Sequence, residues 1–112
     1  MANPLTDEEI KVMEMMGFFF YSMGLNERAQ RTAKAILAID PNNNWALRTL
    51  TALKFKEGNY QEVLDLTFAL SLENCQSSED KEMLKLKARA LYKLGKIVEA
   101  QTLMQNINNK EI

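Results

Sequence analysis

Few side chains in this sequence are of the kinds that carry out chemistry. The chain has no His, which removes the commonest general base and the commonest metal ligand. Its single cysteine, Cys75, has no second cysteine to bridge and no His to activate it. The adjacent acids Glu8–Glu9 and Glu79–Asp80 stand where helices are predicted to begin, and acids there complement the helix dipole. The sequence therefore predicts neither an enzyme nor a site for a metal or cofactor.

Basic residues at four-residue intervals form the most regular charged pattern. Four residues are close to one helical turn, so one face of a predicted helix carries a positive stripe: Lys81, Lys85, Arg89 and Lys93. The stripe is either a solvated face or a surface for acidic residues of a bound helix or peptide. Nucleic acid is a poor partner, because 14 basic residues are balanced by 15 acidic ones over the whole chain.

Three versions of one phrase indicate how the elements are arranged: YSMGLNERAQ, FKEGNYQEVL and YKLGKIVEAQ. They align Gly24, Gly58 and Gly95 at spacings of 34 and 37 residues. Each Gly is predicted to end a helix in the left-handed conformation. Apolar residues recur at intervals of three and four on both sides of each Gly. The pattern predicts six helices, at 8–23, 27–39, 45–57, 60–72, 79–94 and 97–107.

Polar residues stand where several of these helices should begin. Asn26 and Asn59 are expected to cap the second and fourth helices, because a side-chain oxygen at this position accepts a free backbone N–H. Ser77 has capping-box spacing to Asp80 and is expected to cap the fifth helix. The predicted helices therefore begin and end at residues suited to these positions.

The composition is that of one globular helical domain. Of 112 residues, 46 % are apolar and 26 % are charged, and only four Gly and two Pro interrupt them. The most apolar run, residues 12–23, contains Glu14 and is too short to cross a bilayer. With one cysteine and a polar N-terminus, the chain is expected to be cytoplasmic and not inserted in a membrane.

The repeat resembles the tetratricopeptide repeat (TPR), which has a period of about 34 residues with small, aromatic and Pro residues at set places. These places hold Gly17, Phe20, Gly24, Ala29, Ala33 and Pro41 in the first repeat; Trp45, Leu50, Gly58, Tyr60 and Leu64 in the second; and Leu84, Ala88, Leu91, Gly95 and Ala100 in the third. Thr51 and Lys54 depart from the pattern. The resemblance implies one all-α domain, residues 1–112, with repeats at about 10–43, 44–77 and 81–112. Its three helix hairpins would stack as a short right-handed solenoid with a concave groove.

The first predicted helix is more apolar than one core-facing stripe requires. In VMEMMGFFFYSMG, the core is expected to take Met13, Met16, Gly17 and Phe20. Surplus apolar residues are then Val12, Met15, Phe18, Phe19 and Met23. Exposing five such side chains forgoes about 10 kcal/mol in total, so they are either extra core or a surface for a partner. At the other end of the chain, five residues are expected to lie uncovered: Ile97, Val98, Leu103, Met104 and Ile107.

In TPR arrays the first helix of each repeat lines the concave face. The resemblance assigns nine residues to a ligand groove there: Phe18, Tyr21, Trp45, Arg48, Ala52, Phe55, Lys85, Arg89 and Tyr92. Aromatic residues and Arg are the types that dominate binding hot spots. The places of the carboxylate clamp of heat-shock co-chaperones hold Glu14, Phe18, Thr49, Glu82 and Leu86, which cannot form that clamp.

In length, repeat number and Met content the chain resembles the small TPR chaperones that hold needle subunits of bacterial type III secretion. This resemblance implies a chaperone that sequesters an amphipathic helix of a polymerising needle subunit in the groove. A small helical co-chaperone would cover the first helix at Val12, Met15, Phe19 and Met23. The alternative is a general TPR adaptor, or a self-associating module, with no role in secretion.

Overall fold

The computed structural model describes residues 5–70 and 77–110, and these residues are helical apart from short turns. Six helices follow one another, and the described residues contain no strand: α1 (Asp7–Ser22), α2 (Asn26–Ile39), α3 (Asn44–Lys56), α4 (Tyr60–Ala69), α5 (Ser78–Lys93) and α6 (Ile97–Lys110). The predicted all-α class is confirmed, and most helix bounds differ by one residue from those predicted. Cys75 and the predicted end of the fourth helix lie outside the described residues.

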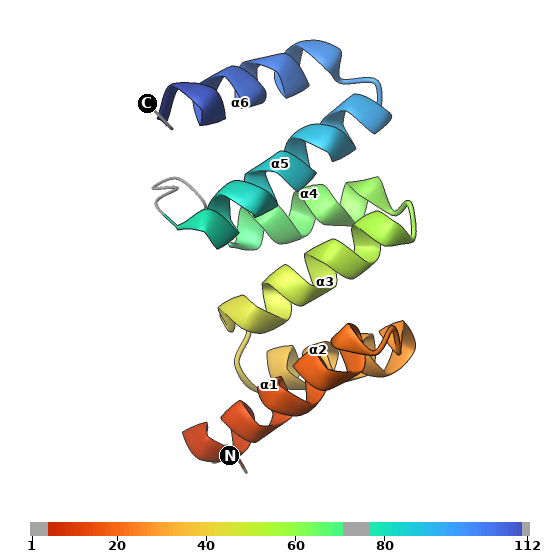
Figure 1. Ribbon diagram of the computed structural model, residues 1–112, viewed down its shortest axis with the longest axis vertical. Helices are drawn as coiled ribbons and strands as arrows, with labels where there is room; N and C mark the ends of the chain where they lie inside the picture. Colours follow the sequence, from red (N-terminus) through yellow and green to blue (C-terminus); the bar gives the residue numbers. More distant parts are fainter. Residues whose placement is uncertain (1–4, 71–76, 111–112) are drawn as a thin grey trace.

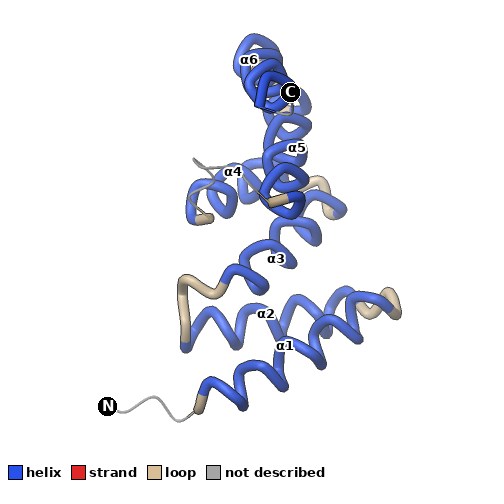
Figure 2. Tube along the Cα trace, turned by 60° about the vertical axis from the view of Figure 1, so that its left-hand side comes forward, coloured by secondary structure: helices blue, strands red, loops and turns tan. Residues whose placement is uncertain are grey.

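The helices stack in pairs along the long axis of a molecule that measures 44 × 27 × 27 Å. Within the pairs, α1 packs on α2, α3 on α4 and α5 on α6, while contacts of α2 with α3 and of α4 with α5 join one pair to the next (Figure 1). The second view separates the α1–α2 pair at one end from α6 at the other (Figure 2). Each pair therefore packs against the pair next to it as well as internally.

A glycine ends the first helix of every pair. Gly24, Gly58 and Gly95 have φ values of 76°, 79° and 84°, in the left-handed region that Gly adopts at low cost. The residue after each Gly donates its N–H to the carbonyl five positions earlier, as from Leu25 to Phe20 at 2.9 Å. This is the Schellman arrangement, which satisfies carbonyls at the helix end. The three turns predicted from the glycine spacing are confirmed.

Helix capping agrees with prediction at one of three positions. The Ser77 hydroxyl accepts the backbone N–H of Asp80 at 3.1 Å, as expected. The expected cap Asn26 is instead the first residue of α2. Asn59 does stand at the N-cap of α4, but its side chain accepts no backbone N–H, and its side-chain nitrogen donates to Glu62 at 2.8 Å. The N-cap positions of α2 and α4 have ψ values of 67° and 72°, outside the extended region that directs a capping side chain toward the helix backbone.

The main core joins α1, α2 and α3. Its buried residues are Ile10, Ala33, Ile36, Ala46 and Leu50, with partly buried Met13 and Trp45 packed against them. The expectation that Met16 belongs to this core is wrong, since its side chain is 51 % exposed. The buried stripe of α1 runs through Ile10, Met13 and Gly17, at intervals of three and four residues, and Met16 lies to one side of it.

A second cluster closes the C-terminal pair. Leu84 of α5 and Ile107 of α6 are buried together, and Leu103 and Met104 pack partly buried against them. The prediction that these residues lie uncovered is therefore wrong for Ile107, which is buried against α5, whereas Leu103 and Met104 are only half-buried. The remaining two residues of that prediction, Ile97 and Val98, are 40 % and 74 % exposed, as expected.

Candidate protein-binding surfaces

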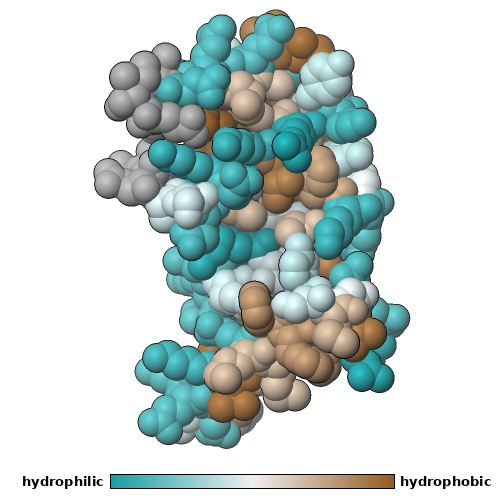
Figure 3. All heavy atoms as spheres, viewed as in Figure 1, coloured by the Kyte–Doolittle hydropathy of each residue, from teal (hydrophilic) through white to brown (hydrophobic). Residues whose placement is uncertain are grey.

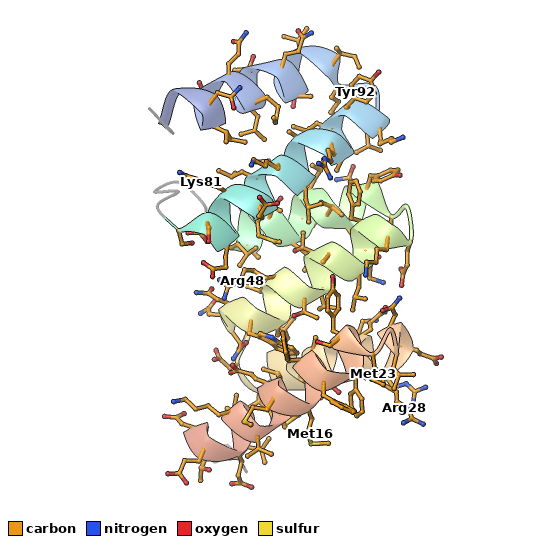
Figure 4. The ribbon with its side chains drawn as sticks, in the orientation of Figure 1. Met16, Met23, Arg28, Arg48, Lys81 and Tyr92 are labelled. Atoms are coloured by element: carbon orange, nitrogen blue, oxygen red, sulfur yellow. The ribbon has the colours of Figure 1, made fainter. Side chains whose placement is uncertain are left out.

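One side of α1 is an exposed apolar surface. Five side chains of α1 and its C-cap, spaced by one, three or four residues, are at least half exposed: Val12, Met15, Met16, Phe19 and Met23. Apolar colour gathers over this helix in the space-filling view (Figure 3), and Figure 4 shows Met16 and Met23 projecting from it. We call these five residues the α1 surface. It contains all four residues predicted to meet a co-chaperone, and Met16 in addition.

The aromatic residues predicted in the groove are partly engaged within the chain. Phe18 of α1 is 62 % exposed, whereas Tyr21 is half-buried and lies under the Lys56 ammonium group, 4.6 Å from its ring centre. Phe55 is half-buried and meets Tyr60 edge to face, with 5.5 Å between ring centres. Of these residues, Phe18 presents the most free aromatic surface.

The groove residues predicted on α3 contribute more to packing than to open surface. Trp45 lies over Gly17 and belongs to the main core, where it is half-buried. Arg48 and Ala52 are also half-buried, and Arg48 projects from the first half of α3 (Figure 4). Replacing Trp45 would therefore alter stability as well as any binding.

The three remaining groove residues come together around a hollow between α5 and α6. Lys85, Arg89 and Tyr92 line this hollow of about 600 Å³, and Tyr92 is 61 % exposed. Lys85 also lies 3.5 Å from Glu82 on its own helix. The other lining residues are apolar or carry amides: Ala88, Ala100, Met104, Gln101, Gln105 and Asn108. The α5/α6 hollow thus combines an apolar floor with a basic wall.

The repeat alignment explains why a hollow exists at this position. Aligned on the glycines, Ala88 corresponds to Gly17 and Met104 corresponds to Ala33. In the first pair of helices these positions are covered by α3, because Trp45 lies over Gly17 while Ala33 packs in the core. The same place beside α5 and α6 is open. The shape of the hollow therefore suits a helix.

The sequence did not predict three further exposed large apolar residues: Leu25, Phe68 and Leu94. Phe68 of α4 is 83 % exposed, more than any other large apolar side chain in the described part of the chain. The signal that could have revealed it is the repeat alignment, in which Phe68 stands where the first repeat has Lys34. An apolar residue at a position that elsewhere faces solvent indicates a further surface.

Within residues 5–70 and 77–110, no three His, Cys, Asp or Glu side chains are grouped closely enough to hold a metal ion. In the same residues, no helix combines the length and hydrophobicity needed to span a bilayer. No protein-family model and no curated protein sequence matches this chain. Inferences about function therefore depend on the surfaces described above.

Proposed function

We propose that this protein is a cytoplasmic chaperone that sequesters an amphipathic helix of a polymerisation-prone partner. The resemblance to TPR chaperones suggests a needle-type secreted subunit as that partner, and a right-handed TPR solenoid as the arrangement of the three helix pairs. The observation that carries the proposal is exposed apolar surface at two separate places. A monomer rarely leaves such patches uncovered unless a partner binds them.

The α5/α6 hollow and the exposed Phe18 would receive the partner's helix. An apolar stripe on that helix would lie on Met104 and Tyr92, which are large and partly exposed. Acidic residues beside the stripe would face Lys85 and Arg89, because opposite charges at the rim orient a helix and speed its encounter. A subunit that polymerises through this helix would remain monomeric while the helix is buried.

The α1 surface would bind a small helical co-chaperone. Each of its five side chains is between 51 % and 72 % exposed, so covering the exposed part contributes about 1 kcal/mol per residue. Met15, Met16 and Met23 have flexible, unbranched side chains that adapt to the shape of an incoming helix. Covering this surface would also prevent non-specific association of the chaperone itself.

Filament assembly of a needle-type subunit tests the proposal. The subunit is mixed with increasing amounts of this chain, and assembly is followed by light scattering and electron microscopy. We expect assembly to stop at a stoichiometric ratio, with a soluble complex of the two chains. The Tyr92→Lys variant should inhibit less well, because its side chain lines the hollow, while Ala38→Lys on the exposed side of α2 should inhibit like the wild type.

Assembly that proceeds unchanged at molar excess of the wild-type chain would refute the chaperone function for this class of partner. The alternative, a general helical adaptor, makes a different prediction for the chain produced alone. An adaptor would be a well-behaved species that binds no hydrophobic dye, whereas the chaperone should aggregate alone and become soluble when produced with its partner.

A further inference from the structure

A polar network lies at the seam between α2 and α4, next to the end of α3, where Gln30, Lys34 and Glu57 also line a hollow of about 380 Å³. Lys54 of α3 is only 8 % exposed, and its ammonium group lies 3.3 Å from Glu57 and 3.7 Å from Glu62. Both carboxylates are about half exposed, with side chains at 47 % and 49 %. The charge of Lys54 is therefore neutralised at the edge of the seam, with water still in reach of both partners.

Gln30 completes this first seam from α2. In the amide orientation that satisfies its neighbours, its nitrogen donates to Glu57 at 2.9 Å, and its oxygen accepts from Lys34 at 3.1 Å and Lys54 at 3.2 Å. Polar groups that are hydrogen-bonded in this way are stable next to water and do not require a second protein to cover them. We define the first seam by Gln30, Lys34, Lys54, Glu57 and Glu62.

The equivalent seam one repeat later, between α4 and α6, has apolar residues at nearly all of these positions. In the glycine alignment, Leu64 replaces Gln30, Phe68 replaces Lys34, Leu91 replaces Lys54 and Leu94 replaces Glu57, while Glu99 keeps the acid of Glu62. Four polar residues thus become four large apolar ones at the same structural places. Two of the four, Phe68 and Leu94, are exposed at 83 % and 39 %, whereas Leu91 is buried.

The second seam is open, and apolar side chains form about half of its lining, with Thr102, Asn106 and four charged residues around them. Leu64, Phe68, Leu91, Val98 and Leu103 line a hollow of about 570 Å³. Phe68 is 83 % exposed and Val98 is 74 % exposed, so both project at its edge rather than filling it. The first seam therefore serves as an internal comparison: the hollow there is smaller, at about 380 Å³, and polar side chains line it.

The charges around the second seam are balanced. Its hollow is also lined by Asp65 and Glu99 and by Lys87 and Lys96, two acids and two bases. A patch that carries both signs can face an identical patch after a two-fold rotation without net repulsion. The basic wall of the α5/α6 hollow carries no such balance of charges, so the walls of two copies of the chain would repel each other. The charges thus favour a second copy of this chain at the second seam.

We infer that the second seam is the contact of a symmetric homodimer, in which Phe68 of each copy enters the hollow of the other. Each copy presents the projecting Phe68 and the hollow on the same surface. A single two-fold contact can therefore fill the hollow of each copy with the aromatic side chain of the other. Buried aromatic side chains of this kind commonly supply most of the binding energy of an interface. The inference goes beyond the proposed chaperone function, since it uses neither the α1 surface nor the α5/α6 hollow.

The test measures the mass of the full chain in solution, with association through α1 suppressed. Met15→Lys and Phe19→Lys are introduced as the background, because both side chains are more than half exposed. We expect this background chain to sediment as a dimer at about 100 µM, a concentration that populates weak complexes. Phe68→Lys introduces the residue type that Lys34 has at the equivalent position of the first seam. Added to the background chain, it should weaken dimerisation about 30-fold or more, as for a hot-spot aromatic.

Tyr92→Lys is the matched control, because it places the same charge at an exposed aromatic residue of the other hollow. It should leave the dimer intact while weakening capture of a partner helix, and Phe68→Lys should do the reverse. Failure of the dimer and failure of the chaperone function are therefore distinguished. Circular dichroism and thermal unfolding verify that each variant is folded, and Val98→Lys replaces Phe68→Lys if that variant is not.

Hydrogen exchange gives an independent readout. On dilution, amides of α4 and of the first half of α6 should lose protection, while those of α1 should not change. A background chain that is monomeric at the same concentration would overturn the inference. A dimer, or any larger species, that survives both Phe68→Lys and Val98→Lys would also overturn it.

Discussion

Trp45 lies directly over Gly17, which ties α3 to the middle of α1. A Cβ added at Gly17 would overlap the indole ring and would approach the Thr32 methyl group to 3.1 Å. Gly17 is in the interior of a helix, where Ala would otherwise be preferred by about 1 kcal/mol. The glycine is therefore retained for close packing between helices rather than for backbone freedom.

Gly17→Ala should destabilise the protein by about 1–2 kcal/mol, because the cost of overpacking exceeds the gain in helix propensity. Urea unfolding measures the change. In a Trp45→Leu background the indole is absent, so the same substitution should instead stabilise by up to about 1 kcal/mol. The same sign of effect in both backgrounds would show that the contact does not constrain α1.

Lys54→Met should lower the free energy of unfolding by about 1–2 kcal/mol, since Glu57 and Glu62 lose their shared cation but remain accessible to water. Thermal or urea unfolding gives the value. Lys34→Met at the exposed edge of the same seam is the control, with an expected change below about 0.5 kcal/mol. If Lys54→Met and Lys34→Met have the same free energy of unfolding, Lys54 contributes no more to stability than a surface charge does.

Phe19→Lys should reduce the binding of a hydrophobic dye and the tendency to aggregate, with little change in the thermal midpoint, because the ring is 57 % exposed. Met13→Lys on the same helix is the contrasting variant. Its side chain packs against the main core, so a charge there should cost about 2–4 kcal/mol. Dye fluorescence that is unchanged in Phe19→Lys would argue against the α1 surface as an interface.

Reversal of charge on α5 should show which of its faces binds a partner. Lys85→Glu with Arg89→Glu should weaken capture of an acidic amphipathic peptide by about tenfold at low salt, and by less at high salt. Lys87 lies between them in sequence but lines the second seam, so Lys87→Glu should have little effect on binding of the peptide. Calorimetric titration compares the variants, and equal losses in both would indicate a general charge effect.

The sequence predicts the helices well because their signals are local. The turns at Gly24, Gly58 and Gly95 require a left-handed residue, and apolar spacing on either side indicates amphipathic helices. Capping at Asn26 and Asn59 was mispredicted because it depends on the backbone angle of the turn, which residue type alone does not determine.

The surfaces are harder to predict because they depend on how helices rotate against each other. Met16 and Gly17 are neighbours in sequence, but the rotation of α1 that buries Gly17 under Trp45 leaves Met16 exposed. Ile107 is buried for the converse reason, since its face of α6 turns toward Leu84. The second seam becomes evident only when equivalent positions of successive repeats are compared, as when Phe68 is compared with Lys34.

The most direct test of the account is a titration of the full chain with three synthetic peptides of matched length. One forms an acidic amphipathic helix, the second has the same composition scrambled to remove its apolar face, and the third carries Lys in place of the acids. We predict that the first peptide alone binds, and that Tyr92→Lys weakens its binding. Equal binding of the amphipathic and scrambled peptides, or no binding of either, would contradict the proposal that this protein captures an amphipathic helix.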